Sequence, residues 1–408
     1  MKHTQASSRS WSGGVSAVVR TSDRIRKQAR RWPCTLLGVG VVSKTAVDAA
    51  IDLANEYNVD IMLIPSRRQV DMDSLGGGYV HGWNAQRFAD HVRARDRGGR
   101  ILMCRDHGGP WQNTVEIAKS LSPAQAMESA KQSYREDIEA GFSVLHLDTS
   151  VTPEGEPSAE DALARLFELY RYCDQTSREL GRDIAFEVGT EEQDSLSHSM
   201  EAFFTTLERI VAFCNAEGLQ KPTFVVAQTG TKVMEARNVG LLDNPYRIEG
   251  ALPSEVFVPR LIKGLQRFDI FLKQHNTDYL SDEVLKWHPW LGIHSANVAP
   301  EYGVAETRAL LRLLYGSRLD HHCERFLELA YNSRKWEKWM LPDTTASDRD
   351  RAIIAGHYVF STDTFQELKS AIERDLRAHG VELDQYLREQ VKVPLLRHLK
   401  AFRLSGMS

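Results

Sequence analysis

Residues 122–148 read SPAQAMESAKQSYREDIEAGFSVLHLD and contain one complete helix followed by one strand. Ser122 is a favourable N-cap and Pro123 suits the first helical position, so we expect a helix over residues 124–140. Gly141 is the stop signal. The apolar run over residues 143–148 then predicts a buried strand. This stretch therefore predicts one unit of an alternating α/β fold.

The same alternation extends over most of the chain. Eight short apolar or β-branched runs are candidate strands, at residues 35–42, 60–64, 100–105, 143–148, 184–188, 223–227, 269–273 and 292–298. Stretches with helical periodicity separate most of them, which is typical of a parallel sheet built from βα units. Eight units predict a closed (β/α)8 TIM barrel. After Gly316 only helical patterns follow, at residues 320–340 and 365–402.

We therefore expect three parts. They are a basic N-terminal tail or first helix over residues 1–32, a TIM barrel over 33–317, and a helical C-terminal region over 318–408 that packs on the barrel. The basic residues of the first part lack an aromatic stacking platform, so we interpret them as a solvated tail or helix and not as a nucleic-acid arm.

Composition excludes several classes of protein. The 408 residues carry a formal net charge of −4, with 42% hydrophobic and 26% charged residues, which is ordinary for a soluble globular protein. No apolar run approaches the roughly 20 residues that cross a bilayer, so no membrane association is expected. The five cysteines form no C-x-x-C pair, which argues against a disulfide framework and favours the cytoplasm.

In a TIM barrel the chemistry lies where the strands end, so polar residues at those positions are the first candidates. The third predicted strand leads into Asp106 and His107, which can face one site only if the strand has already given way to a loop. On the fourth strand His146 and Asp148 alternate onto one face, where they serve as functional or supporting groups. Glu187 and Glu191 follow on the fifth strand, and either can bind metal or transfer a proton.

The remaining strand ends add further candidates. The sixth leads into Gln228, Thr229 and Gly230, a short loop able to hold an anion or a sugar hydroxyl, and the seventh ends in His275. His107, His275 and a glutamate from the fifth strand make a mixed nitrogen and oxygen set typical of a catalytic divalent metal. Such a cation polarises a ketose carbonyl and stabilises an enediolate, which serves aldol cleavage, aldol condensation and sugar epimerisation.

Several sequence pieces, taken in order, carry a family resemblance. They are Gln69-Val70, Gly77-Gly78-Tyr79, Asp106-His107-x-Gly109-Pro110, His146-Leu147-Asp148-Thr149-Ser150, Gly189-Thr190-Glu191, Gln228-Thr229-Gly230, His275-Asn276-Thr277-Asp278-Tyr279 and Val298-Ala299-Pro300. From about residue 24 onward the chain resembles the family of class II D-tagatose-1,6-bisphosphate aldolase non-catalytic subunits. The resemblance implies a TIM barrel related to zinc-dependent aldolases.

The resemblance also implies roles for particular residues. Asp106 takes the catalytic acid role, His107 and His275 are metal ligands, and Asn297 contacts the ketose. The second metal histidine of catalytic aldolases has no counterpart, so Glu187 or Glu191 would have to complete the site. Thr229, Asn297 and Glu187 depart from the usual pattern of the subunit family, which favours an autonomous enzyme.

Two hypotheses follow. The first is a metal-dependent sugar (ketose or ketose-phosphate) aldolase or 4-epimerase, working by enediolate or retro-aldol chemistry. The second is a non-catalytic subunit that stabilises a separate aldolase, with an exposed apolar patch and no metal; a sugar-binding or regulatory role is a third reading. Under the first, the predicted contacts of the sugar or its anion are Arg67, Arg68, Gln69, Asp148, Gln228, Thr229, Gly230 and Asn297. A homo-oligomer is compatible with either.

Two other groups have structural interpretations. His321, His322 and Cys323 resemble a metal cluster, but neighbouring helical residues point about 100° apart, so we expect them to pack and not to chelate. The tryptophans at residues 287–290 and 336–339 are expected in the core or at an interface.

Overall fold

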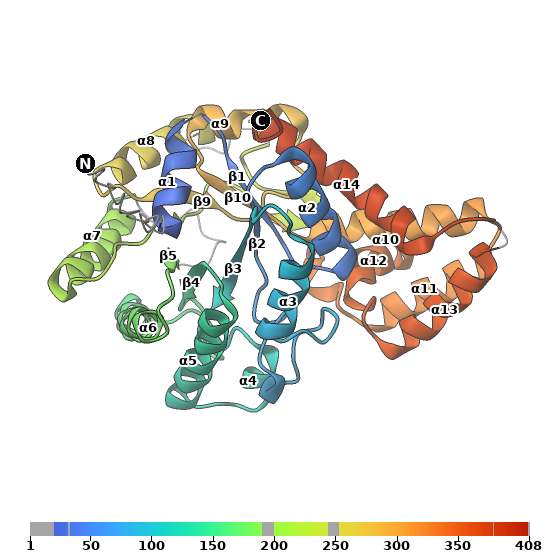
Figure 1. The fold of residues 1–408 in the computed structure, drawn as a ribbon, viewed down its shortest axis with the longest axis horizontal. Coiled ribbons are helices and arrows are strands. Elements are labelled where there is room, and N and C mark those ends of the chain that lie inside the picture. The colour runs from blue at the N-terminus through green and yellow to red at the C-terminus, as the bar shows by residue number, and fades with distance from the viewer. Residues whose placement is uncertain (1–19, 32, 190–199, 244–252, 378, 407–408) are drawn as a thin grey trace, which may run out of the picture.

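The protein, seen in a computed structural model, is built around a closed barrel of eight parallel strands (Figure 1). The structure describes residues 20–31, 33–189, 200–243, 253–377 and 379–406. The barrel strands are β1 (Leu36–Val39), β2 (Ile61–Leu63), β3 (Ile101–Gly108), β4 (Val144–Asp148), β5 (Ala185–Gly189), β6 (Phe224–Val226), β9 (Phe271–Gln274) and β10 (Ser295–Val298). Each strand pairs with its neighbour in the chain, and β1 closes the barrel against β10, with Leu36 opposite Ser295.

Helices cover the outside of the barrel. They are α1 (Thr21–Arg31), α2 (Lys44–Tyr57), α3 (Ala85–Arg95), α4 (Thr114–Ala118), α5 (Pro123–Ala140), α6 (Ala159–Glu179), α7 (Met200–Glu217), α8 (Ser254–Gln266), α9 (Asp282–Leu291) and α10 (Pro300–Gly316). The strands are buried along their length with few exceptions, as expected for a parallel sheet covered on its outer face. The predicted (β/α)8 barrel is therefore confirmed.

The predicted helix–strand unit forms as expected. Ser122 accepts a hydrogen bond from the Gln125 backbone N–H, Gln125 bonds back to the Ser122 N–H, and Pro123 opens α5. Gly141 ends the helix in the left-handed conformation at φ 87°. These local signals are sufficient to set the helix because each satisfies a backbone group that the helix end leaves free.

Two details of the strands differ from the prediction. β3 runs on to Gly108 instead of ending at residue 105, and its register with β4 shifts between Arg105 and Gly108. A two-stranded antiparallel hairpin, β7 (Val233–Met234) with β8 (Arg237–Asn238), follows β6 and was not predicted. Its strands are too short to produce a visible sequence pattern.

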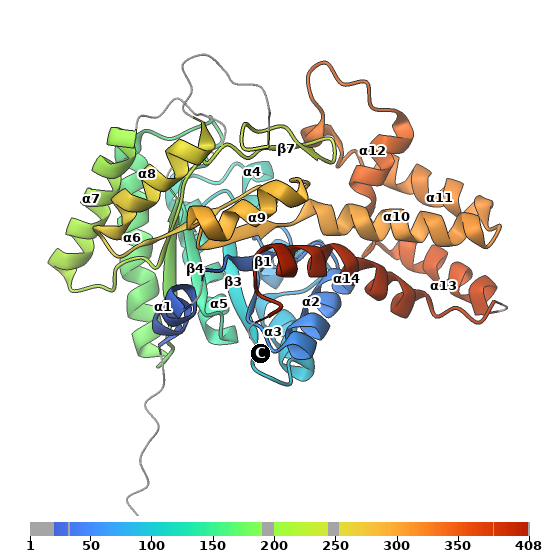
Figure 2. The same ribbon diagram turned by 90° about the horizontal axis from the view of Figure 1, so that it is seen from above.

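The C-terminal region is helical, with α11 (Asp320–Asn332), α12 (Asp348–Ala355), α13 (Asp363–Arg377) and α14 (Leu383–Ala401). The helical pattern over residues 365–402 forms two helices, because a turn at residues 379–382 separates α13 from α14. Figure 2 shows α10 and α14 extending from the barrel toward α11 and α13.

This region has a hydrophobic core of its own. Leu310 and Leu314 of α10 pack there with Phe326, whereas Leu395 and Leu399 of α14 pack into the barrel core. Helices α10 and α14 thus contribute to both cores. The division of the chain at residue 317 stays a prediction.

Helix α1 is fixed by ion pairs with residues near the N-terminal ends of the strands. Arg24 contacts Asp60 just before β2, and Arg26 contacts Asp269 just before β9, at 2.6 Å and 3.0 Å. Arg30 also pairs with Asp269. These arginines therefore bind the barrel, at the end opposite the carboxyl ends of the strands. No helix among the described residues has the length and apolar character needed to cross a membrane.

A buried carboxyl joins the C-terminal helices to the first βα loop. Ser43, the N-cap of α2, accepts the Ala46 N–H and donates its hydroxyl proton to Glu306 of α10. Glu306 is 3% exposed, and burial raises its pKa from 4.5 to about 7, against the lowering effect of hydrogen bonds from Ser43 and Thr45. The folded state therefore binds this proton more tightly than the unfolded chain does.

The free energy of unfolding is expected to fall as the pH rises from 4.5 through about 7. The contribution of Glu306 is fully present below pH 4.5 and is lost as the pH rises through about 7, on the order of 3 kcal/mol in total. Glu306→Gln keeps a hydrogen-bond acceptor for Ser43 but cannot ionise. Urea unfolding at pH 5, 6, 7 and 8 should show a flatter pH dependence for this variant, and parallel curves for the two proteins would contradict the assignment.

Candidate active site

A cavity of about 460 Å³ opens at the carboxyl ends of the strands. Its walls include Arg68, Gln69, Asp106, His107, His146, Asp148, His275 and Asn297, together with Lys338, Trp339, His357 and Tyr358 of the C-terminal region. The mouth of the barrel and the C-terminal helices therefore form one site.

A bulge in β3 turns two adjacent side chains toward this cavity. His107 has a φ of 44°, outside the extended conformation of the strand, so both Asp106 and His107 face the site although neither has left β3. Gly109 follows at φ 116°, and a Cβ there would lie 2.1 Å from the Asp148 carbonyl oxygen. The predicted loop is therefore replaced by a bulge, which has the same effect on the two side chains.

Arg105 anchors the strand immediately before the bulge. Its guanidinium is buried, donates to Asp137 of α5 from two nitrogens at 2.7 and 2.5 Å, and also donates to the carbonyl oxygens of Pro65 and Val70. These bonds tie β3 to α5 and to the loop after β2. They fix the backbone from which Asp106 projects.

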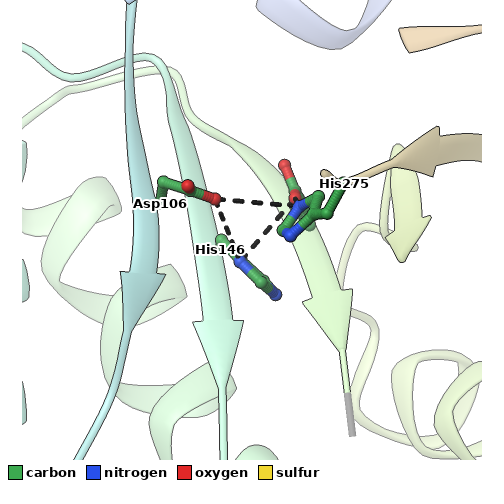
Figure 3. A group of neighbouring side chains, drawn as sticks. Asp106, His146 and His275 are labelled. Atoms are coloured by element: carbon green, nitrogen blue, oxygen red, sulfur yellow. Dashed lines mark hydrogen bonds and ion pairs between the residues drawn. The ribbon is translucent and has the colours of Figure 1, made fainter. Parts of the chain in front are cut away.

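Figure 3 shows Asp106 of β3, His146 of β4 and His275, which follows β9, converging at the floor of the cavity. Glu187 of β5 completes the group. His146 Nδ1 lies 3.6 Å from Asp106 Oδ1 and 3.7 Å from Glu187 Oε1. His275 Nε2 lies 3.7 Å from Asp106 Oδ1 and 3.3 Å from Glu187 Oε1. Zinc bonds of 2.0–2.2 Å in a tetrahedron place neighbouring ligand atoms about 3.3–3.6 Å apart. These donor atoms therefore fit a small divalent cation in both chemistry and spacing.

The electrostatic surroundings of Glu187 are unusual. Its side chain has no exposed surface, and the buried Lys273 ammonium donates to Glu187 Oε2 at 2.6 Å. Burial alone would raise the pKa of Glu187, but Lys273, His146 and His275 lower it to about 2. Glu187 is therefore a carboxylate below the cavity floor, with one oxygen on Lys273 and the other toward the histidines.

Asp106 faces the cavity. Burial would raise its pKa, but the charges of His107 and His275 and a hydrogen bond with His146 lower it far below the ordinary value. Asn297 Nδ2 donates to Asp106 Oδ1 at 3.4 Å. A carboxylate held in this way is suited to contact a substrate.

His107 is directed to a different partner. Its Nδ1 lies 2.7 Å from Asp148 Oδ2, while Asp148 Oδ1 accepts the backbone N–H and the hydroxyl of Ser150. Burial lowers the pKa of His107, but Asp106 and Asp148 raise it to about 9. Its ring centroid lies 5.5 Å from that of His146 and 5.2 Å from that of His275. His107 therefore lies beside the four-residue cluster, paired with a carboxylate.

The structure brings together only some of the predicted residues. Asp106, His107, His275, Asp148, Asn297, Arg68 and Gln69 line the cavity, Glu187 lies beneath it, and Glu191 falls outside the described residues. His146, left between function and support in the sequence, lies in the cluster.

Arg67 does not line the cavity. It is 1% exposed and forms ion pairs with Asp71 at 3.0 Å and Glu116 at 2.7 Å, and it donates to the Gly109 carbonyl oxygen. Its charge is therefore satisfied inside the protein. Of the two arginines predicted to contact an anion, only Arg68 lines the cavity.

The loop after β6 bonds to its own neighbours. Gln228 Oε1 accepts the backbone N–H groups of Gly230 and Thr231, and Thr229 Oγ1 accepts Gln274 Nε2 at 2.6 Å. The Gly230 carbonyl oxygen accepts the Leu242 N–H. None of Gln228, Thr229 and Gly230 lines the cavity, because these bonds close the loop on itself.

The expectation that His321 and His322 point apart and cannot chelate together is wrong, because with Asp375 they offer ligand atoms within 4.8 Å of one another. Their ring centroids lie 3.9 Å apart on α11, and His322 Nε2 lies 2.9 Å from Asp375 of α13. His322 and Cys323 are buried in packing, as expected. Side-chain torsions have overcome the 100° angular separation of the two Cα positions.

Solved structures with a similar fold include sugar enzymes. A probable tagatose 6 phosphate kinase from Sinorhizobium meliloti 1021 superposes with a TM-score of 0.66 at 20% identity, covering 90% of this chain and 100% of that chain. A fructose-bisphosphate aldolase from Campylobacter jejuni gives 0.55 at 14% identity, covering 94% of each chain. The fructuronate-tagaturonate epimerase UxaE from Cohnella laeviribosi gives 0.56 at 12% identity, covering 91% of this chain and 82% of that chain.

At these identities the likeness establishes the fold and not the reaction. The barrel fold is shared with an aldolase and an epimerase among the solved structures. Residues 22–193 match the family described as D-tagatose-1,6-bisphosphate aldolase subunit GatZ/KbaZ-like, which confirms over that part of the chain the resemblance read from the sequence.

Proposed function

We propose that this protein is a metal-dependent enzyme that cleaves or epimerises a ketose or ketose phosphate by aldol-type chemistry. The observation that carries the proposal is the convergence of two imidazole nitrogens and two carboxylate oxygens, 3.3–3.7 Å apart across the four acid–imidazole pairs, at the floor of a cavity large enough for a sugar. His146, His275 and Glu187 would hold the cation, zinc being the best match to this donor set. His146 would thus take the ligand role predicted for His107.

A bound divalent cation supplies Lewis acidity, which polarises a substrate carbonyl. The chain's own residues then have distinct tasks. Asp106, the cavity-facing member of the cluster, exchanges a proton with the substrate, and Asn297 orients it through the bond to Oδ1. His107, held by Asp148 through Nδ1, presents its other edge to hydroxyl or carbonyl groups of the sugar. The buried Lys273 holds Glu187 in place from below.

A second candidate function is the non-catalytic aldolase subunit, and two observations favour it. Lys273 already neutralises Glu187, and His107 pairs with Asp148, so these buried charges are balanced without a cation. In addition, Trp287 and Trp290 lie one turn apart on α9 and are 36% and 72% exposed, on the barrel flank where a partner would dock. The two functions make opposite predictions about metal content.

Metal analysis of the purified protein tests the proposal. We expect stoichiometric divalent metal in the wild type, its loss in His275→Ala and His146→Ala, and its retention in His107→Ala, because His107 is directed to Asp148. Turnover of ketose phosphates measured on the same samples should disappear with the metal. His379→Ala, which removes an exposed imidazole from the turn after α13, is the matched control. A wild type with neither metal nor turnover would contradict the enzyme function and favour the non-catalytic subunit.

A further inference from the structure

The rim of the cavity carries two cations with no acidic partner in the part of the chain that the structure describes. Arg68 follows β2, and Lys338 belongs to the short 3-10 helix Glu337–Trp339 of the C-terminal region. Both side chains are exposed, and neither forms an ion pair with a carboxylate among the described residues. By contrast, Arg67, next to Arg68 in the chain, has two acidic partners.

The two cations line the same cavity, together with Trp339 and Tyr358. The Lys338 ammonium lies 4.7 Å from the ring centroid of Trp339 and 5.5 Å from that of Tyr358. The surrounding protein, which displaces water from the ammonium, and in second place the charge of Arg68 lower the pKa of Lys338 to about 8. Two like charges on the wall of one cavity, without a carboxylate partner among the described residues, favour the binding of an anion there.

A buried donor lies beside them. The Gln112 side chain is 5% exposed and lines the same cavity, and its Nε2 has no hydrogen-bond partner among the described residues. The Gln112 carbonyl oxygen accepts Arg68 Nε at 3.3 Å, which links the two residues. A buried amide donor without a partner costs stability unless a ligand satisfies it.

Lys338 is held over the barrel mouth by the hairpin that follows β6. The Glu235 backbone N–H donates to the Trp339 carbonyl oxygen at 3.0 Å, and Glu235 Oε1 accepts the Leu341 N–H at 3.2 Å. These bonds fix the backbone immediately after Lys338. The charge is thus placed by the fold.

We infer that Arg68, Lys338 and Gln112 form a subsite for the anionic end group of the sugar, a phosphate ester or a carboxylate. This inference rests on the proposed function in taking a sugar as the occupant of the cavity. The reactive end of the sugar then faces Asp106 and His275 at the floor, while its charged end lies at the rim under the C-terminal region. The C-terminal helices thereby select substrates with a negative charge.

Calorimetric titration tests the subsite without requiring turnover. The probes are D-tagatose 6-phosphate, D-tagaturonate and uncharged D-tagatose, each titrated into the full-length protein after EDTA treatment and again with zinc added. We expect Lys338→Met and Arg68→Met each to lower the affinity for the anionic sugars about tenfold or more. The affinity for D-tagatose should stay that of the wild type. Lys263→Met, which removes the same charge from the exposed face of α8, should bind like the wild type.

The two anionic probes identify the end group. Tighter binding of the phosphate assigns the subsite to a phosphate ester, and tighter binding of the uronate assigns it to a carboxylate. Equal losses for charged and uncharged sugars, unchanged affinity in both variants, or no binding of either anion by the wild type would overturn the subsite. The proposed function can fail while the subsite holds. In that case the wild type binds the anionic sugars, both variants bind them more weakly, and the protein has neither metal nor turnover.

Discussion

Asp106→Asn is expected to lower kcat about 10²–10⁴-fold while the metal content stays that of the wild type. The substitution keeps the size of the side chain and the contact with Asn297 but removes the group that exchanges a proton. Asp106 faces the cavity, whereas His146, His275 and Glu187 supply the proposed ligand set without it. Loss of proton transfer without loss of the metal is therefore the signature of this role.

The measurement is kcat and KM for a ketose phosphate, together with metal analysis of the same preparation. Asp282→Asn, which removes a carboxylate from the surface of α9, is the matched control and should behave like the wild type. If Asp106→Asn loses the metal along with the activity, Asp106 is a ligand. Unchanged turnover would remove Asp106 from the chemistry.

Lys273→Met is expected to destabilise the metal-free protein by about 3–5 kcal/mol. Lys273 and Glu187 are both fully buried and 2.6 Å apart, so removal of the ammonium leaves a carboxylate in the interior without its counter-charge. Burial would lower the pKa of Lys273, but Glu187 and Asp106 raise it, so the wild-type lysine is charged. A bound cation replaces the missing positive charge, and zinc should recover part of the loss.

Urea unfolding in EDTA and in zinc measures both effects. The double variant Lys273→Met with Glu187→Gln should recover most of the stability, because neither charge remains. Lys44→Met, which breaks the partly exposed pair with Asp48, should cost less than about 1 kcal/mol. A loss in Lys273→Met as small as that of Lys44→Met would contradict the buried pair. A loss that zinc does not reduce would argue against a cation site beside Glu187.

Sequence reasoning located the barrel well, since its signals are local. A strand of a covered parallel sheet is a short apolar run, and a helix such as α5 carries its own start and stop at Ser122 and Gly141. Asp106 and His275 were found because the carboxyl ends of all eight strands meet on one face of the barrel. The bulge in β3 was missed because it depends on the register with β4.

Some of the predicted site residues do not line the cavity because they have partners elsewhere in the chain. Arg67 pairs with Glu116 and Thr229 accepts a hydrogen bond from Gln274, and no local pattern shows such contacts. Conversely, Gln112 and Lys338 carry no signal of their own, and only the packing of the C-terminal region places Lys338 over the mouth.

The sequence by itself determined the fold class, the order of the strands and the end of the barrel at which the polar residues gather. Those properties follow from hydrophobic periodicity and backbone capping, which act over a few residues. The tertiary structure alone decided which charges are neutralised inside the protein and which remain free to meet a ligand. That choice depends on distances between side chains from different strands and helices, and burial makes each such pairing decisive, because an unpaired charge in the interior is costly.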